Sequence, residues 1–222
     1  MKHNIMLQKE DKTIFQQNFF AEIEPIKLID PLAETLGVVA ANNEIYYYYQ
    51  EIVKFAGHSC LAVSGAFMIC KIALKKLYEN ETPIRGEIRV NFKGDEELNV
   101  NGPISQVVSF ITGAAPNTGF KGLGGKFSRY KLLSFSKNDK PQEGITAEID
   151  FERIDNGKKV SIAYRPNLVK KDPLMGKLLE LILRGKASTE EKIMFGNLWQ
   201  SGVKEVLTNA PDGVFVVNEE KK

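Results

Sequence analysis

The sequence predicts an α+β fold, with helices packed on a mostly antiparallel sheet and further helices at the C-terminal end. Three successive patterns predict it: apolar residues at helical spacing over residues 30–78, strand-type alternation over residues 84–164, and helical spacing again over residues 174–207. Helices that precede and follow a block of strands are typical of α+β proteins, whereas α/β proteins alternate strands with helices.

The chain shows no internal repeat and no linker-like stretch, so we expect one domain over residues 1–222. Its core is expected at about residues 30–165, with residues 166–222 as a helical C-terminal extension. Of the 222 residues, 43% are hydrophobic and 26% are charged. A chain of this size and composition can bury a core without help from disulfides.

Charge, apolar runs and cysteine content narrow the expected partners and location. The net charge of +2 is too small to favour nucleic acid or an anionic membrane surface. No apolar run approaches the roughly 20 residues that span a bilayer, and residues 1–20 lack the apolar stretch of a secretory signal. Two cysteines are too few for a disulfide framework. We therefore expect a cytoplasmic protein that binds neither nucleic acid nor membrane.

The first two predicted helices lie in the N-terminal quarter, after a lead-in over residues 1–25. Asp30 can cap a helix that has Pro31 at its first position and extends to Val39. Apolar residues at helical spacing predict a second helix over residues 44–55. It contains four tyrosines at positions 46–49, which would point in all directions. They would form either an oligomer interface or an ordinary surface.

The third predicted helix covers residues 60–78. Its first half is apolar nearly all round and rich in alanine, glycine and serine. This composition predicts burial on several sides, with small residues that let neighbouring elements approach closely. Cys60 and Cys70 lie on it about 15 Å apart at the helical rise, which is too far for a disulfide.

The rest of the chain is predicted as strands followed by helices. Strand-type alternation predicts strands at residues 84–92, 127–135, 145–154 and 159–164. Asp155-Asn156-Gly157 is a hairpin turn between the last two, and residues 104–112 fit either strand or helix. Two helices follow, one at Leu174–Leu183 and one that a capping box at residues 188–191 opens and that runs to Leu207. Residues from about 212 onward are expected to be loosely held.

The segment His58-Ser59-Cys60 is the main candidate for chemistry. Ser59 is a suitable N-cap, which would place Cys60 in the first helical turn, where the helix dipole favours a thiolate. Residues two apart in extended chain point the same way, so the His58 and Cys60 side chains can converge. Such a pair suits zinc or another late transition metal, and also a cysteine nucleophile with a histidine base. The alternative is a packed cysteine beside a hydrogen-bonded loop histidine.

The number of available ligands limits the metal interpretation. The chain has two histidines, and His3 lies near the N-terminus, which leaves His58 as the well-placed one. A four-ligand site would need carboxylates, water or a second protomer, which is the open pattern of catalytic zinc sites. Ligand softness favours zinc, with nickel or iron as alternatives. Cys70, on the apolar face of the same helix, is interpreted as a packing residue.

A glycine-rich segment, residues 113–126, is the second candidate. It contains five glycines and one proline, and the cations Lys126 and Arg129 stand at or just beyond its C-terminal end. Backbone N–H groups and these cations could bind an anion there. The segment is not a Walker loop, because Phe127 follows Lys126, and it lacks the third glycine of a dinucleotide fingerprint. The alternative is a tight glycine-rich connection.

The stretch Phe55-Ala-Gly-His-Ser-Cys60, which opens a helix rich in small residues, resembles the E-type subunit family of formylmethanofuran dehydrogenase. That family's hallmark is Gly-His-x-Cys-Pro before a helix. Residues 111–115 and 119–126 are similar to its Thr-Gly-Cys-Thr and Gly-Lys segments. The likeness covers roughly residues 30–165.

This resemblance implies an α+β core, often dimeric, with a metal-capable site at His58 and Cys60. With Lys126 and Arg129, Thr112 is a third candidate ligand-binding residue. The chain departs from the family pattern at Leu61, which replaces the proline, and at Ala114, which replaces a common second cysteine. It also lacks the C-terminal cysteine-rich zinc finger that some members carry.

The leading functional prediction is a cytoplasmic, homodimeric metal-binding protein with His58 and Cys60 as ligands and candidate catalytic residues. The pocket is expected between the buried helix and residues 113–126. A small anionic or one-carbon substrate would be held there by Lys126 and Arg129. The alternative is a non-catalytic module that binds a small molecule or a protein, without metal and with Cys60 in the core.

Overall fold

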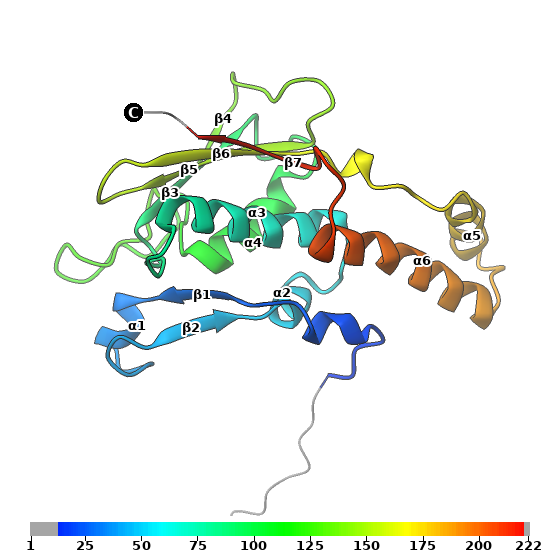
Figure 1. Ribbon diagram of the computed structural model, residues 1–222, viewed down its shortest axis with the longest axis horizontal. Helices are drawn as coiled ribbons and strands as arrows, with labels where there is room; N and C mark the ends of the chain where they lie inside the picture. Colours follow the sequence, from blue (N-terminus) through cyan, green and yellow to red (C-terminus); the bar gives the residue numbers. More distant parts are fainter. Residues whose placement is uncertain (1–12, 220–222) are drawn as a thin grey trace, which may run out of the picture.

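The computed structural model describes residues 13–219 and confirms the predicted α+β fold (Figure 1). A five-stranded sheet forms one layer, helices α3 and α4 pack against one of its faces, and a two-stranded ribbon lies on the far side of these helices. Helices α5 and α6 extend to one side (Figure 1). His3 lies outside the described residues.

The elements have the following bounds in chain order: η1 Asn18–Ala21, β1 Ile26–Ile29, α1 Pro31–Thr35, β2 Glu44–Tyr47, α2 Tyr49–Ala56, α3 Leu61–Tyr78, β3 Ile88–Lys93, α4 Asn101–Thr112, β4 Leu133–Ser136, β5 Ala147–Arg153, β6 Lys159–Tyr164, η2 Pro166–Leu168, α5 Leu174–Leu183, α6 Thr189–Thr208 and β7 Phe215–Glu219. Within residues 13–219, no helix combines the length and the apolar character needed to cross a membrane.

The main sheet has the strand order β4-β3-β5-β6-β7 and is antiparallel except between β3 and β4. The predicted turn Asp155-Asn156-Gly157 joins β5 to β6. Gly157 takes the positive φ of 70° that this tight turn needs, and the Asn156 side chain accepts a hydrogen bond from the Lys158 N–H at 2.9 Å. The hairpin prediction is therefore confirmed.

Helix α3 lies between the two sheet layers, which is why its sequence is apolar on several sides. Gly65 provides the close approach that its small residues predicted. A Cβ at this position would lie 2.4 Å from Cζ of Tyr164, which is fully buried on β6. The Tyr164 hydroxyl donates a hydrogen bond to the Leu61 carbonyl at 2.7 Å, so β6 also fixes the start of α3.

The predicted helix over residues 44–55 is wrong in its first half. Tyr46 and Tyr47 lie on β2 and pair with β1, and α2 begins only at Tyr49. Tyrosine favours pleated strands, and here strand pairing prevails over helical spacing. Tyr48 is the N-cap of α2, and its N–H donates to the Glu51 carboxylate at 2.8 Å. The four tyrosines are therefore not on one helix.

Other boundaries differ from prediction for local reasons. Asp30 caps α1 as expected, accepting from the Leu32 and Ala33 N–H groups. The helix nevertheless stops at Thr35, before Gly37 with its φ of 71°. The ambiguous apolar stretch at residues 104–112 is part of helix α4. The strand expected at residues 127–135 is reduced to β4.

The two C-terminal helices are confirmed, including the capping box in which Ser188 accepts from the Glu191 N–H at 3.2 Å. The expectation that residues from 212 onward are loosely held is wrong for β7, which pairs with β6. Phe215 stacks on Tyr164 with ring centroids 5.0 Å apart. Strand pairing and this ring contact therefore hold the segment in place.

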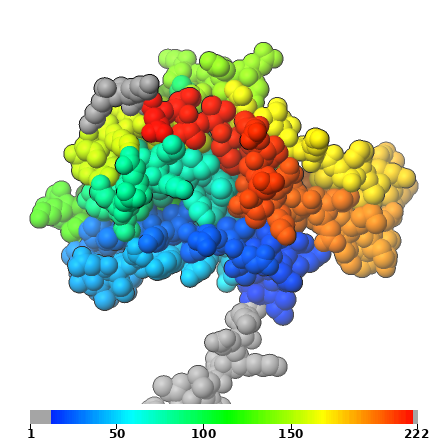
Figure 2. All heavy atoms as spheres, in the orientation of Figure 1, coloured from blue at the N-terminus to red at the C-terminus, as the bar shows by residue number. Residues whose placement is uncertain are grey.

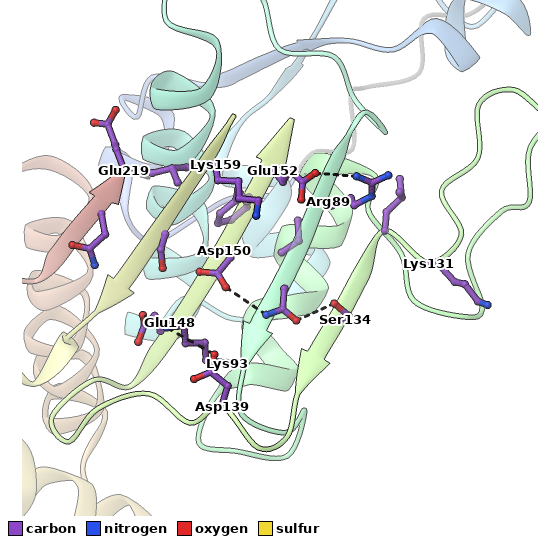
Figure 3. A pocket seen from close by; sticks show the side chains of 17 residues that line it. Arg89, Lys93, Lys131, Ser134, Asp139, Glu148, Asp150, Glu152, Lys159 and Glu219 are labelled. Carbon is purple, nitrogen blue, oxygen red and sulfur yellow. Dashed lines mark hydrogen bonds and ion pairs between the residues drawn. The ribbon is translucent and has the colours of Figure 1, made fainter. Parts of the chain in front are cut away.

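The outer face of the main sheet carries charged and polar side chains and no helix from the described part of the chain (Figures 1 and 3). These side chains pair across neighbouring strands. Arg89 on β3 contacts Glu152 on β5 at 3.0 Å, and Lys93 contacts Glu148 at 2.8 Å. Because the charges compensate one another, this hollow face is best described as a solvated sheet surface.

Candidate functional site

The side chains of His58 and Cys60 converge, as predicted from their spacing in extended chain. Cys60 Sγ lies 3.3 Å from His58 Nε2, and His58 Nδ1 lies 3.0 Å from the Ala56 carbonyl oxygen. A carbonyl only accepts, so Nδ1 carries a proton and Nε2 is the ring nitrogen presented to sulfur. We call this arrangement the thiol–imidazole pair.

Side chains from distant elements hold the pair in place through Ser59. The Ser59 hydroxyl forms a 2.8 Å hydrogen bond with the buried Tyr49 hydroxyl on α2. The Ser59 carbonyl accepts from Trp199 Nε1 at 2.9 Å and from Gln200 Nε2 at 3.1 Å, both on α6. These contacts restrict the backbone between His58 and Cys60, so the pair is pre-organised rather than a feature of a free loop.

The predicted N-cap is wrong by one residue: Cys60, not Ser59, caps α3. The Ser59 hydroxyl is used by Tyr49, and Cys60 has extended dihedral angles but makes no side-chain capping bond. The Cys60 carbonyl accepts the first intrahelical bond, from the Ser64 N–H at 2.9 Å. The sulfur therefore lies at the positive end of α3, beside N–H groups that no side chain among residues 13–219 caps.

A cavity of about 350 Å³ opens beside the pair. Its walls come from the start of α3 and the residues just before it, the segment between η2 and α5, the first turn of α5, and helix α6. The lining residues are mostly apolar, with two lysines: His58, Cys60, Leu61, Ala62, Val169, Lys170, Lys171, Met175, Leu198, Trp199 and Gly202. We call this cavity the thiol pocket. It has the size and the mixture of apolar and polar groups of a small-molecule site.

The thiol–imidazole pair has the geometry of two ligands of a tetrahedral metal site. A thiolate and an imidazole bound tetrahedrally to one zinc ion stand about 3.5 Å apart, from the usual bond lengths of ~2.3 and ~2.05 Å, and the observed separation is 3.3 Å. The Nδ1 hydrogen bond to Ala56 is the usual outer-shell contact of a metal-bound histidine. Residues 13–219 contain no group of three or more histidine, cysteine or acidic side chains that could hold a metal. The pair therefore offers two ligands and leaves other positions open.

The other predicted ligand-binding residues lie apart from the thiol pocket. The Thr112 hydroxyl is buried, donates to the Val108 carbonyl and accepts from the Ala114 N–H. Lys126 is exposed at the tip of the glycine-rich segment. Arg129 is buried and paired with Asp30 at 2.6 Å. None of these three is among the residues that line the thiol pocket within the described chain.

The two cysteines occupy contrasting environments. Cys60 is half-buried beside the pocket, whereas Cys70 is fully buried in the core. Burial raises the pKa of the Cys70 thiol above its ordinary value. Both cysteines are free, and the interpretation of Cys70 as a packing residue agrees with its position.

The residues that the sequence did not identify are Lys170, Lys171 and Trp199. They follow Cys60 by more than 100 positions, and only the return of the C-terminal helices brings them to the pocket. The two adjacent lysines before a helix were a weak signal for an anion site. Nothing in the local pattern around Trp199 indicated that its indole would bind the Ser59 carbonyl.

Fold and site together define an α+β protein with a thiol–imidazole pair at the mouth of an apolar pocket. No protein-family model matches the chain, and no curated protein shows significant similarity to it.

Proposed function

We propose that this protein binds a metal ion through His58 and Cys60, with zinc as the first choice and nickel or iron as alternatives. The observation that supports this most is the 3.3 Å separation of sulfur and Nε2, with the second ring nitrogen fixed by the Ala56 carbonyl. The match of Gly57-His58-Ser59-Cys60 to the Gly-His-x-Cys motif supports membership of the E-type subunit family of formylmethanofuran dehydrogenase.

The thiol pocket would hold a small anionic or one-carbon substrate beside the metal. Lys170 and Lys171 supply positive charge at its wall, a role that the sequence had suggested for Lys126 and Arg129. Leu61, Met175 and Trp199 give the pocket apolar surface. A bound zinc ion would supply Lewis-acid polarisation of a carbonyl oxygen. We place the protein in the cytoplasm, where thiols stay reduced, because both cysteines are free.

We further propose a homodimer in which α5 and α6 take part. These helices project from the rest of the molecule (Figure 2), and they expose several large apolar side chains: Leu174, Leu179, Leu183, Ile193 and Met194. An exposed apolar surface of this kind favours association. A second copy is also one source of the metal ligands that the pair lacks.

Iodoacetamide should alkylate Cys60 in the native full-length protein, and zinc should slow this reaction at least about tenfold, because a metal-bound thiolate is withheld from the reagent. Intact-mass spectrometry measures the rate of alkylation with and without zinc. Cys70 is the internal control, since its burial should prevent labelling until the protein is unfolded.

The variant His58→Ala tests whether His58 is the second metal ligand beside Cys60. It should keep Cys60 reactive but remove most of the protection by zinc, because one of the two ligands is lost. An alkylation rate that zinc leaves unchanged in the native protein would contradict the metal proposal. A Cys60 that resists labelling in all conditions would support the alternative of a packed cysteine in a binding module.

The geometry also supports a second function, a cysteine nucleophile with a histidine base. Here the observation is the chain of contacts from Cys60 to His58 to the Ala56 carbonyl, which is the order of nucleophile, base and orienting group. The N–H groups at the start of α3 could then stabilise a developing oxyanion. In the same assay this function predicts that His58→Ala slows alkylation of metal-free protein and that zinc has no effect.

A further inference from the structure

A second cleft, of about 730 Å³, runs along α4 and shares no lining residue with the thiol pocket in the described chain. The glycine-rich segment, β4 and the end of α2 form its other walls. Two arginines, Arg85 and Arg129, lie at the end of the cleft where α4 stops, at its C-cap Gly113.

The two arginines share one buried carboxylate. Asp30, which is 3% exposed, contacts Arg85 Nη1 at 3.0 Å through one oxygen and Arg129 Nη2 at 2.6 Å through the other. One negative charge therefore faces two positive charges. Arg85 also donates from Nε to the Ile111 carbonyl and from Nη2 to the Phe110 carbonyl, in the last turn of α4.

The Arg129 side chain has no comparable hydrogen bonds to backbone carbonyls among residues 13–219. It is 6% exposed, and its Nε is buried without a hydrogen-bond partner among residues 13–219. Burial, opposed by Asp30 and reinforced by the charge of Arg85, lowers the pKa of its guanidinium group from the ordinary value. A buried cation that shares its only counter-charge and has an unpaired N–H group is costly, so an additional anion at this position would be stabilising.

Gly113 lies where the two arginines come close to each other. A Cβ built on this residue would lie 3.3 Å from Arg129 Nη1 and 3.3 Å from Arg85 Cζ. Both guanidinium groups therefore lie close to Gly113, and a side chain there would crowd them. Gly113, Arg85 and Arg129 all line the cleft, so a ligand in the cleft can reach both arginines.

The neighbouring walls are aromatic. Phe55 and Phe110 stack with ring centroids 4.8 Å apart, and Phe120 on the glycine-rich segment is 44% exposed. Aromatic surface next to paired arginines recognises a ligand that has both a charged oxyanion and an apolar body.

We propose that this cleft binds a small organic anion, with its carboxylate or phosphate at Arg85, Arg129 and Gly113 and its apolar body against Phe55, Phe110 and Phe120. The site is separate from the proposed metal centre. Its ligand can be a second substrate or an effector of the same protein.

Phenylacetate and phenyl phosphate are suitable probes, and isothermal titration calorimetry on the full-length protein measures their binding. At least one should bind saturably, and the uncharged phenylacetamide should bind at least about tenfold more weakly, because it cannot supply the missing charge. The tighter of the two anions identifies the oxyanion that the site prefers. Absence of saturable binding by both would overturn the proposal.

Two variants locate the binding. Phe120→Ala removes an exposed ring, and Gly113→Ala places a methyl group between the arginines. Each substitution should lower the affinity for the preferred anion at least about tenfold. Gly185→Ala is the matched control for backbone strain, because Gly185 also has a positive φ, 67°, but no atom within 4 Å of the added Cβ. Unchanged affinity in Phe120→Ala would overturn the proposal even if Gly113→Ala fails to fold. Cys60→Ala should bind the probe normally, which separates this result from the metal proposal.

Discussion

Replacing Asp30 with alanine should lower the free energy of unfolding by about 3–5 kcal/mol, which is the usual cost of leaving a buried charge without its partner. The carboxylate is the shared counter-charge of Arg85 and Arg129 and also caps α1. Its removal leaves the buried guanidinium group of Arg129 and the partly exposed one of Arg85 without their shared counter-charge. Urea denaturation followed by circular dichroism measures the change.

Glu152→Ala is the control for the loss of an ordinary ion pair. Glu152 pairs with Arg89 on the open face of the sheet, where the Arg89 side chain is 52% exposed. A solvated pair of this kind contributes about 0–1 kcal/mol. If Asp30→Ala lowered the free energy of unfolding no more than Glu152→Ala does, Arg85 and Arg129 would not depend on a buried carboxylate. That result would contradict the unbalanced positive charge at these two arginines.

Gly65→Ala should destabilise the protein by about 1–3 kcal/mol or more, which is the range for overpacking a closed core. The added methyl group would lie 2.4 Å from Cζ of Tyr164. That ring is fully buried and its hydroxyl is bound to the Leu61 carbonyl, so it cannot swing away freely. The strain exceeds the gain of up to about 1 kcal/mol that alanine brings to a helix interior.

Gly176→Ala in α5 supplies the matched control. It is also a helical glycine, but nothing lies within 4 Å of its added Cβ. This change should leave stability unaltered or raise it by up to about 1 kcal/mol, since only helix propensity changes. Equal effects of the two substitutions on the thermal midpoint would contradict the close packing of α3 on β6.

Local sequence signals predicted the elements that depend on their own residues. The capping box at Ser188, the turn before Gly157 and the small-residue pattern of α3 each have a local physical cause, and each is present in the fold. The run at Tyr46 and Tyr47 was misread because pairing with β1, some 20 positions earlier, decides its conformation. The order at β7 likewise comes from its partner β6.

In the candidate site, too, local features were predicted from the sequence and features that depend on distant residues were not. The convergence of His58 and Cys60 follows from extended backbone two residues long, so the sequence was sufficient to predict it. The walls of the thiol pocket come from Val169, Trp199 and their neighbours, and only tertiary packing brings them there. Arg129 was predicted as a candidate anion ligand, but its partner Asp30 lies 99 positions away and was predicted only as a helix cap.

Elemental analysis of the full-length protein, purified without a metal-affinity tag, tests the proposed metal centre most directly. We expect stoichiometric zinc, nickel or iron in the native protein, its loss in His58→Ala and in Cys60→Ala, and its retention in Cys70→Ala. A folded native protein without metal, or equal metal content in all four proteins, would contradict it.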